Sequence, residues 1–118
     1  METTAPTGYP DCLTASWLAV TLGVDPRRLD AMRRAGELIA TRPPGSTEWL
    51  YPAWQLHRGR VRDGVPQIVA AGRAAGLDEN GLYAALTARR GLGGDRRLAD
   101  LLAAGEEARV AEAVRGRA

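Results

Sequence analysis

The feature that most constrains the fold is the segment 22–26, Leu-Gly-Val-Asp-Pro, which must end one helix and begin the next. Gly23 favours the left-handed conformation that commonly ends helices. Asp25 is a preferred N-cap, and Pro26 suits the first helical position, where a backbone N–H has no partner. The spacing therefore predicts two short helices joined by a tight turn. Thr14 is the expected N-cap of the first.

The chain after the second helix cannot continue as a helix. Gly36 is expected to end that helix, which should run from residue 26 to about 35. Residues 38–41 and 48–51 are short apolar segments with β-branched or aromatic members, and two prolines and a glycine lie between them. This pattern predicts a β-hairpin. A short helix through Gln55 is one expected continuation.

Glycine also divides the C-terminal half of the sequence. Apolar residues return at helical spacing after a basic turn or linker at residues 58–64. The breaks at Gly76, residues 91–94 and Gly105 predict four short helices: 65–75, one capped by Asp78, one around 98–102 and one over 106–114. We therefore expect a mainly α fold in three parts: a disordered start (1–11), two helices with a short β-hairpin (12–57), and a small helical bundle (64–118).

Composition excludes several classes of protein. Cys12 is the one cysteine and His57 the one histidine, so an intramolecular disulfide or a zinc site is not expected. No apolar run approaches the ~20 residues that span a bilayer. The first twenty residues have no basic start and do not resemble a signal peptide. No nucleophile motif is present. We expect a cytoplasmic, non-enzymatic protein without cofactor, metal or membrane partner.

The placement of arginine points to nucleic acid. All sixteen basic residues are arginine, which a G- and C-rich genome explains by codon usage alone. Four of them nevertheless fall within one short helix. Arginine binds O6 and N7 of guanine bidentately and also binds phosphate. The alternative is a solvated helix face. We expect double-stranded DNA to be bound by that helix and by the hairpin loop, through Arg27, Arg28, Arg33, Arg34 and Arg42.

The N-terminal pattern resembles a known family. Leu13-Thr14, Leu18-Ala19, Leu22-Gly23-Val24, Leu29, Arg33 to Gly36, Leu38, and Arg42 followed by Tyr51-Pro52 look like the excisionase/MerR-type winged helix-turn-helix. The match covers about 45 residues. The resemblance implies DNA binding by the second helix and by the hairpin, called the wing. The hairpin here departs from the family in carrying two prolines and Trp49.

The C-terminal pattern resembles a second family. The segment 51–56, Asp63-Gly64, Gly76-Leu77-Asp78, Leu92-Gly93-Gly94, the leucines at 98–102 and the last Ala/Val helix look like the C-terminal domain of MbcA/ParS/Xre-type antitoxins. The resemblance implies binding to a toxin protein, often one that degrades NAD, and repression of its own operon. The layout is also similar to small mycobacterial winged-helix DNA-binding regulators, which have no known toxin.

Together these patterns predict a winged helix-turn-helix followed by a helical bundle. The expected function is transcriptional regulation by a homodimer, with an antitoxin-like bundle that binds a partner protein. Two alternatives stay open: a stand-alone regulator without a toxin, and a protein-binding adaptor that has lost DNA binding. Trp17 and Trp54 are expected in the core, whereas Trp49 is a candidate for a dimer contact.

Overall fold

The fold is described from a computed structural model, which covers residues 9, 11–88 and 97–116. The expected glycine break at 91–94 lies outside these residues, as does the predicted disordered start except for residues 9 and 11. The N-terminal half contains, in chain order, β1 (Cys12–Thr14), α1 (Ala15–Leu22), α2 (Pro26–Arg34), β2 (Leu50–Pro52), a 3-10 helix (Ala53–Gln55), β3 (Leu56–His57) and β4 (Arg60–Val61).

The two N-terminal helices form as their capping residues predict. The Thr14 hydroxyl accepts a hydrogen bond from the Trp17 amide at 3.3 Å, and the Asp25 carboxylate accepts one from the Arg28 amide at 2.9 Å. Gly23 adopts φ 72°, the left-handed conformation that ends α1. Helices α1 and α2 therefore meet across a turn of three residues, and Leu18 and Leu29 are buried between them and the strands.

The predicted hairpin is only partly correct. Thr41 and Leu50 exchange both backbone hydrogen bonds, at 2.9 and 2.8 Å, so the loop 42–49 closes as expected. The strand β2, however, pairs antiparallel with β1, which precedes α1. Residues 38–40 form no strand, because the buried Gln55 side chain accepts from the Ile39 amide and donates to the Ile39 carbonyl, both at 2.7 Å.

The basic segment after the 3-10 helix, which was expected to be a turn or linker, contains the turn of a second hairpin. Strands β3 and β4 pair antiparallel, with Leu56 opposite Val61 and His57 opposite Arg60. Arg58 and Gly59 form the turn with φ values of 55° and 76°. A short helix over Ala53–Gln55 precedes it, as expected.

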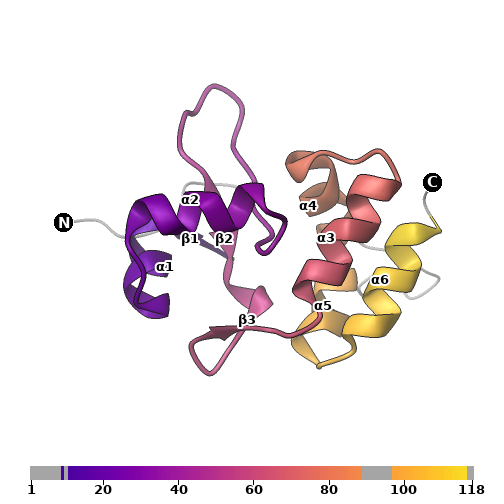
Figure 1. Cartoon of the computed structure of the whole chain (residues 1–118). Coiled ribbons are helices and arrows are strands. Elements are labelled where there is room, and N and C mark those ends of the chain that lie inside the picture. Colours follow the sequence, from indigo (N-terminus) through magenta and orange to yellow (C-terminus); the bar gives the residue numbers. More distant parts are fainter. Residues whose placement is uncertain (1–8, 10, 89–96, 117–118) are drawn as a thin grey trace.

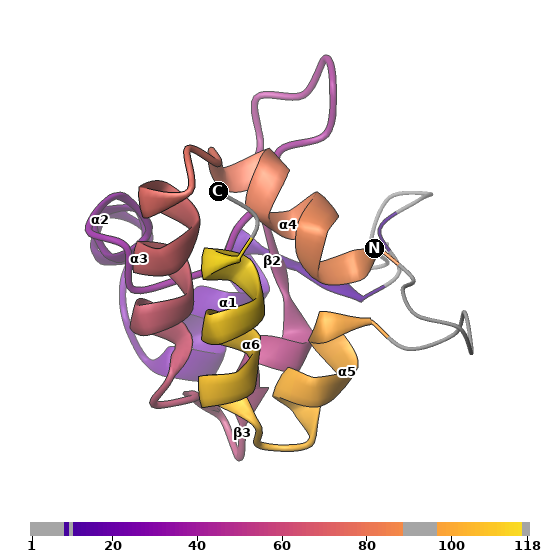
Figure 2. The ribbon, with the colours of Figure 1, turned by 90° about the vertical axis from the view of Figure 1, so that its right-hand side faces the viewer.

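The C-terminal half is a helical bundle. Its helices are α3 (Val65–Ala74), α4 (Glu79–Thr87), α5 (Leu98–Ala103) and α6 (Glu107–Arg115). These four helices confirm the predicted positions to within a few residues. Helices α3 and α6 lie side by side, and α5 packs beside the lower part of α6, on the side away from α3 (Figures 1 and 2). Among the described residues, no helix is long and apolar enough to cross a membrane.

The two halves have separate cores that touch. One core fills the N-terminal half around Leu18, Leu29 and Tyr51, and the other fills the bundle. Ile39, which follows α2, belongs to the bundle core, and Val61 packs against both. The segment leading out of α2 is thus fixed to the bundle. The fold is mainly helical with two small antiparallel strand pairs.

The tryptophans differ from expectation. Trp17 is 46 % exposed on α1, so the prediction that it lies in the core is wrong. The next residue on the helix, Leu18, fills the core instead. Trp54 is half-buried and packs against the bundle core, and its buried indole N–H has no hydrogen-bond partner.

Candidate nucleic-acid interface

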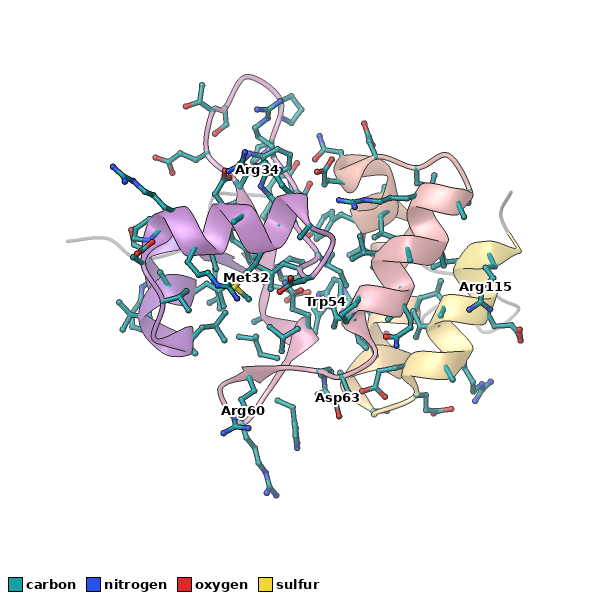
Figure 3. The ribbon with its side chains drawn as sticks, viewed as in Figure 1. Met32, Arg34, Trp54, Arg60, Asp63 and Arg115 are labelled. Atoms are coloured by element: carbon teal, nitrogen blue, oxygen red, sulfur yellow. The ribbon has the colours of Figure 1, made fainter. Side chains whose placement is uncertain are left out.

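Helix α2 presents an arginine-bearing face to solvent. Leu29 is buried against the N-terminal core, whereas Arg27, Arg28 and Arg34 are exposed. Positions four and seven residues after Arg27 return to the same side of an α-helix. Ala31, also exposed, therefore lies between Arg27 and Arg34 and leaves the middle of this face shallow. Figure 3 shows Arg34 at the end of α2 beside the loop 42–49.

Arg33 does not belong to this exposed face. It is 9 % exposed, and its guanidinium forms ion pairs with Asp30 at 2.6 Å and with Glu79 of α4 at 3.4 Å. The hydrogen bond from Arg33 lowers the pKa of the Asp30 carboxyl. Its Nε–H is buried and has no partner. Arg33 was expected to contact DNA together with the other arginines of this helix, but the structure places its side chain inside the protein, apart from the exposed face that Arg27, Arg28 and Arg34 form.

Trp49 connects the loop 42–49 to α2. The Arg33 guanidinium lies 4.1 Å from the centre of the indole ring, and the Arg42 guanidinium lies 4.8 Å from it. Both distances fall within the range of cation–π contacts. Arg42 itself is exposed. Trp49 is half-buried against the N-terminal core, so it acts as a support that holds Arg42 near the arginine face of α2.

Asn80 at the start of α4 fixes the base of the same loop. Its side-chain oxygen accepts from the Thr41 hydroxyl at 2.9 Å and from the Arg42 amide at 2.7 Å, and its side-chain nitrogen donates to the Arg42 carbonyl at 3.0 Å. Sequence reasoning missed Asn80 because an asparagine in the first turn of a helix is ordinary. No local pattern indicates a partner 38 residues away.

The charges of the chain are unevenly distributed. Residues 12–62 contain eight arginines and four carboxylates, a net charge of +4, whereas residues 63–118 contain eight of each. Arg97, Arg109 and Arg115 in the C-terminal half form ion pairs with nearby carboxylates. Arg27 and Arg28 form no ion pair with any residue that the structure describes. Uncompensated positive charge therefore gathers on the N-terminal half.

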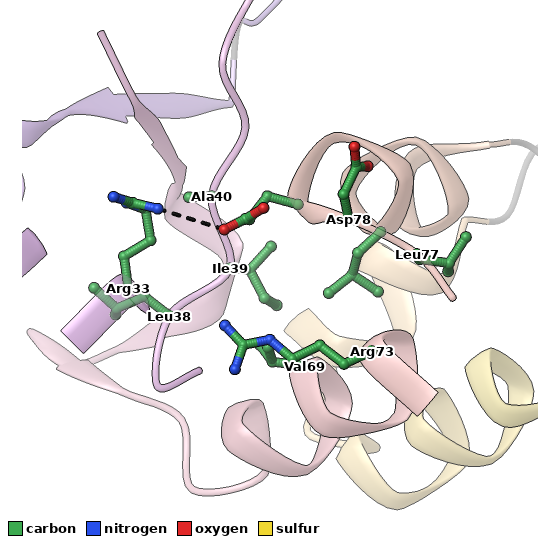
Figure 4. A pocket seen from close by; sticks show the side chains of 10 residues that line it. Arg33, Leu38, Ile39, Ala40, Val69, Arg73, Leu77 and Asp78 are labelled. Atoms are coloured by element: carbon green, nitrogen blue, oxygen red, sulfur yellow. Dashed lines mark hydrogen bonds and ion pairs between the residues drawn. The ribbon is translucent and has the colours of Figure 1, made fainter. Parts of the chain in front are cut away.

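A small cavity lies between α2 and the bundle. It measures about 130 Å³ and is lined by apolar side chains such as Ile39 and Leu82, with a few polar groups at its edge (Figure 4). Arg73 donates from this edge to the carbonyl of Arg34 at 3.1 Å, and the Asp78 carboxylate caps α4 by accepting from the Gly81 amide at 2.7 Å. These polar groups already form hydrogen bonds within the protein, so the cavity gives no reason to infer a ligand.

The two residues most suited to chemistry lie in different two-stranded sheets. His57 is exposed on β3, and Cys12 is buried on β1. Burial raises the pKa of the Cys12 thiol to about 11, and the thiol donates weakly to the Tyr83 hydroxyl at 3.7 Å. A thiol with so high a pKa is a poor nucleophile at neutral pH. Within the described residues, no group of three or more His, Cys, Asp or Glu side chains could hold a metal ion.

The fold is similar to that of a solved protein. The NMR structure of Rv2175c matches with a TM-score of 0.77, covering 98 % of this chain and 85 % of that one, at 19 % sequence identity. At this identity the likeness shows the fold alone. No family model matches the sequence, and no curated protein matches it either.

Proposed function

We propose that this protein is a small, cytoplasmic DNA-binding transcriptional regulator. In this proposal α1 and α2 form a helix-turn-helix, and the loop 42–49 is its wing. The observation that carries the proposal is the exposed face of α2, where Arg27, Arg28 and Arg34 surround a small residue, Ala31. The net charge of +4 on residues 12–62 supports it, because attraction to phosphate dominates the affinity of most DNA-binding proteins.

The geometry suggests a division of roles among the arginines. Arg27 and Arg28 lie in the first turn of α2, the part of a recognition helix that contacts base edges in the major groove. Arg34 lies in the last turn and is partly neutralised by Asp30 at 3.0 Å, so we assign it to a flanking phosphate. Arg42 is presented by the loop on Trp49 and suits a phosphate or the minor groove. Arg33 positions α2 from within.

A titration with DNA tests the proposal. The probe is a fluorescein-labelled 24-base-pair duplex of mixed sequence, with anisotropy measured between 50 and 200 mM NaCl. Each phosphate contact adds about 0.9 to the slope of log K against log salt. A duplex of mixed sequence is bound non-specifically, and there Arg27 and Arg28 bind phosphates in place of guanine. The variant Arg27→Gln/Arg28→Gln should therefore lower the slope by up to about 1.8, so that between 50 and 200 mM NaCl its affinity falls about 12-fold less than that of the unaltered protein.

A matched control comes from the bundle. Arg109 and Arg115 are also exposed, but both form ion pairs on α6. The variant Arg109→Gln/Arg115→Gln should bind DNA as the unaltered protein does. Equal binding by the α2 variant and the unaltered protein would show that α2 is not the recognition helix.

A second experiment, selection of bound sequences from a pool of random duplexes, should identify the operator. We expect guanine at the operator positions that face Arg27 and Arg28.

A second candidate function is binding of a partner protein by the bundle. A groove of about 650 Å³ runs between α3 and α6. Its charged lining residues are three carboxylates and one arginine: Asp63, Glu107, Glu112 and Arg115. An acidic groove favours a basic partner, which is compatible with an antitoxin role and with an adaptor role. Co-expression with the products of neighbouring genes, followed by purification, tests for a toxin. A Glu107→Lys/Glu112→Lys variant should lose any partner held by this groove.

A homodimer is the expected form on DNA. One helix-turn-helix unit of about 45 residues contacts only a few base pairs. Dimers of such units commonly bind two half-sites that lie about one helical turn of DNA apart. Light scattering of the free protein and of its DNA complex measures the stoichiometry. A complex with one chain per selected operator would contradict this part of the proposal.

A further inference from the structure

The β3–β4 hairpin carries two arginines, Arg58 and Arg60, that have no part in the contacts proposed above for α2 and the loop 42–49. We propose that Arg58 and Arg60 form a second contact with the DNA phosphate backbone, on the side of α2 opposite the loop 42–49. This inference rests on the proposed DNA-binding function and extends its surface to a hairpin that the sequence predicted as a turn or linker.

The charges on the hairpin are exposed and uncompensated. Arg58 and Arg60 are both exposed, and neither forms an ion pair with a described residue. The nearest carboxylate in sequence is Asp63, which follows the hairpin and is also exposed. Two exposed arginines on the bundle, Arg109 and Arg115, are by contrast paired with carboxylates. Arg58 and Arg60 are thus free to bind an anion.

Arg62 shows how the hairpin is held in place. Its guanidinium donates to the Trp54 carbonyl and to the Ala103 carbonyl of α5, both at 3.1 Å, and its amide donates to the Gln55 carbonyl at 2.9 Å. One arginine of the hairpin therefore anchors it to the body of the protein. A contact surface fixed in this way loses less entropy on binding than a free loop does.

The turn between β3 and β4 has an arginine, Arg58, at a position whose backbone conformation favours other residues. Arg58 has φ 55° and is the one non-glycine residue with a positive φ in the part of the chain described. Two-residue turns of this kind strongly favour asparagine, aspartate or glycine at such positions, and other residues are strained there. An arginine at the tip of an exposed hairpin is therefore disfavoured by local conformation, which points to a role for its side chain.

The hairpin and the loop 42–49 flank α2. The loop projects from one end of the N-terminal half and the hairpin from the other, and α2 lies at the side of the molecule between them (Figures 1 and 2). Figure 3 shows Arg60 on the hairpin at the bottom of the view, and Arg34 on α2 at the base of the loop 42–49. A helix seated in a major groove has a phosphate backbone on both sides. Loop and hairpin are placed to contact one backbone each.

The test uses the titration already described with a variant that preserves the turn. In Arg58→Asn/Arg60→Gln, asparagine tolerates the positive φ and the charges are removed, so the melting temperature should be unchanged or higher. The slope of log K against log salt should fall by about 1.8, equally for duplexes of unrelated sequence, because phosphate contacts carry no sequence information. A second variant, Arg58→Gly/Arg60→Gln, guards against an effect specific to asparagine.

The outcomes separate this inference from the proposed function. An unchanged salt slope in both hairpin variants, together with a reduced slope in Arg27→Gln/Arg28→Gln, overturns the hairpin contact and leaves the recognition helix standing. A reduced slope in the hairpin variants with normal binding by the α2 variant supports the hairpin and overturns the recognition helix. A full-length protein that binds no duplex at 50 mM NaCl overturns both.

Discussion

Replacement of Gln55 by leucine should destabilise the whole protein, although glutamine and leucine are similar in size. The Gln55 side chain is fully buried. Its oxygen accepts from the Ile39 amide at 2.7 Å, and its nitrogen donates to the carbonyls of Ile39 at 2.7 Å and Pro52 at 3.1 Å. Leucine can make none of these bonds. The Gln55→Leu variant would therefore leave buried backbone groups unpaired at the segment that joins α2 to the bundle.

The magnitude follows from the number of groups left without partners. A buried polar group that loses its hydrogen bond costs about 1–3 kcal/mol, and the two groups of Ile39 together would cost about 2–6 kcal/mol. Burial of the leucine side chain offsets part of this. We expect a net loss of about 2–4 kcal/mol in the free energy of unfolding. For a chain of 118 residues this lowers the melting temperature by about 8–16 °C.

Urea unfolding followed by circular dichroism measures the loss. The control is Gln67→Leu on α3, an exposed position where the same change should alter the free energy of unfolding by less than about 0.5 kcal/mol. A second variant, Gln55→Glu, keeps the acceptor but loses the donor. Burial raises the pKa of such a carboxyl, so this variant should lose stability as the pH rises towards 7 and regain it on acidification. A Gln55→Leu protein as stable as the Gln67→Leu control would refute the argument.

Three further predictions concern other parts of the fold. Asn80→Ala should loosen the base of the loop 42–49 by about 1 kcal/mol, seen as roughly fivefold faster hydrogen exchange at the Arg42 amide. Gly36→Ala, at φ 83°, should lower the free energy of unfolding, measured by thermal denaturation, by more than the ~1–2 kcal/mol expected for Gly23→Ala. The new Cβ at residue 36 would lie 3.0 Å from the Arg73 guanidinium, whereas a Cβ at residue 23 would meet no atom within 4 Å. Cys12 should react with iodoacetamide at pH 8 about two orders of magnitude more slowly than in urea, and the difference should shrink as the pH approaches 11.

The helices could be predicted from the sequence because local residues determine their ends. Thr14, Asp25 and Asp78 each accept a hydrogen bond from a backbone amide three residues later, as an N-cap does. Gly23 ends α1 in the left-handed conformation. Such signals act within a few residues, so a single sequence contains them in full.

The pairing of the strands could not be predicted in the same way. Strand β2 pairs with β1, some 38 residues earlier, rather than mainly with the neighbouring segment 38–40. In the register of Thr41 and Leu50, the next hydrogen-bonded pair would place Ile39 opposite Pro52, which has no N–H to donate. The Gln55 side chain pairs both backbone groups of Ile39 instead. The burial of Arg33 was missed for a related reason, since Asp30 is visible as a helical neighbour but Glu79 of α4 is not.

The buried Arg33 links the candidate interface to the bundle. It pairs with Asp30 on α2, lies over Trp49 of the loop and reaches Glu79 on α4. The Arg33 guanidinium thus contacts three elements at once. It helps to fix the orientation of the exposed face of α2, the position of Trp49 beneath Arg42, and the first turn of α4. Under the proposed function, a protein that binds the bundle near α4 and alters this contact would also change DNA binding. Arginines that look equivalent in the sequence therefore divide by burial into Arg33, which orients the candidate interface, and several others whose side chains are exposed to solvent.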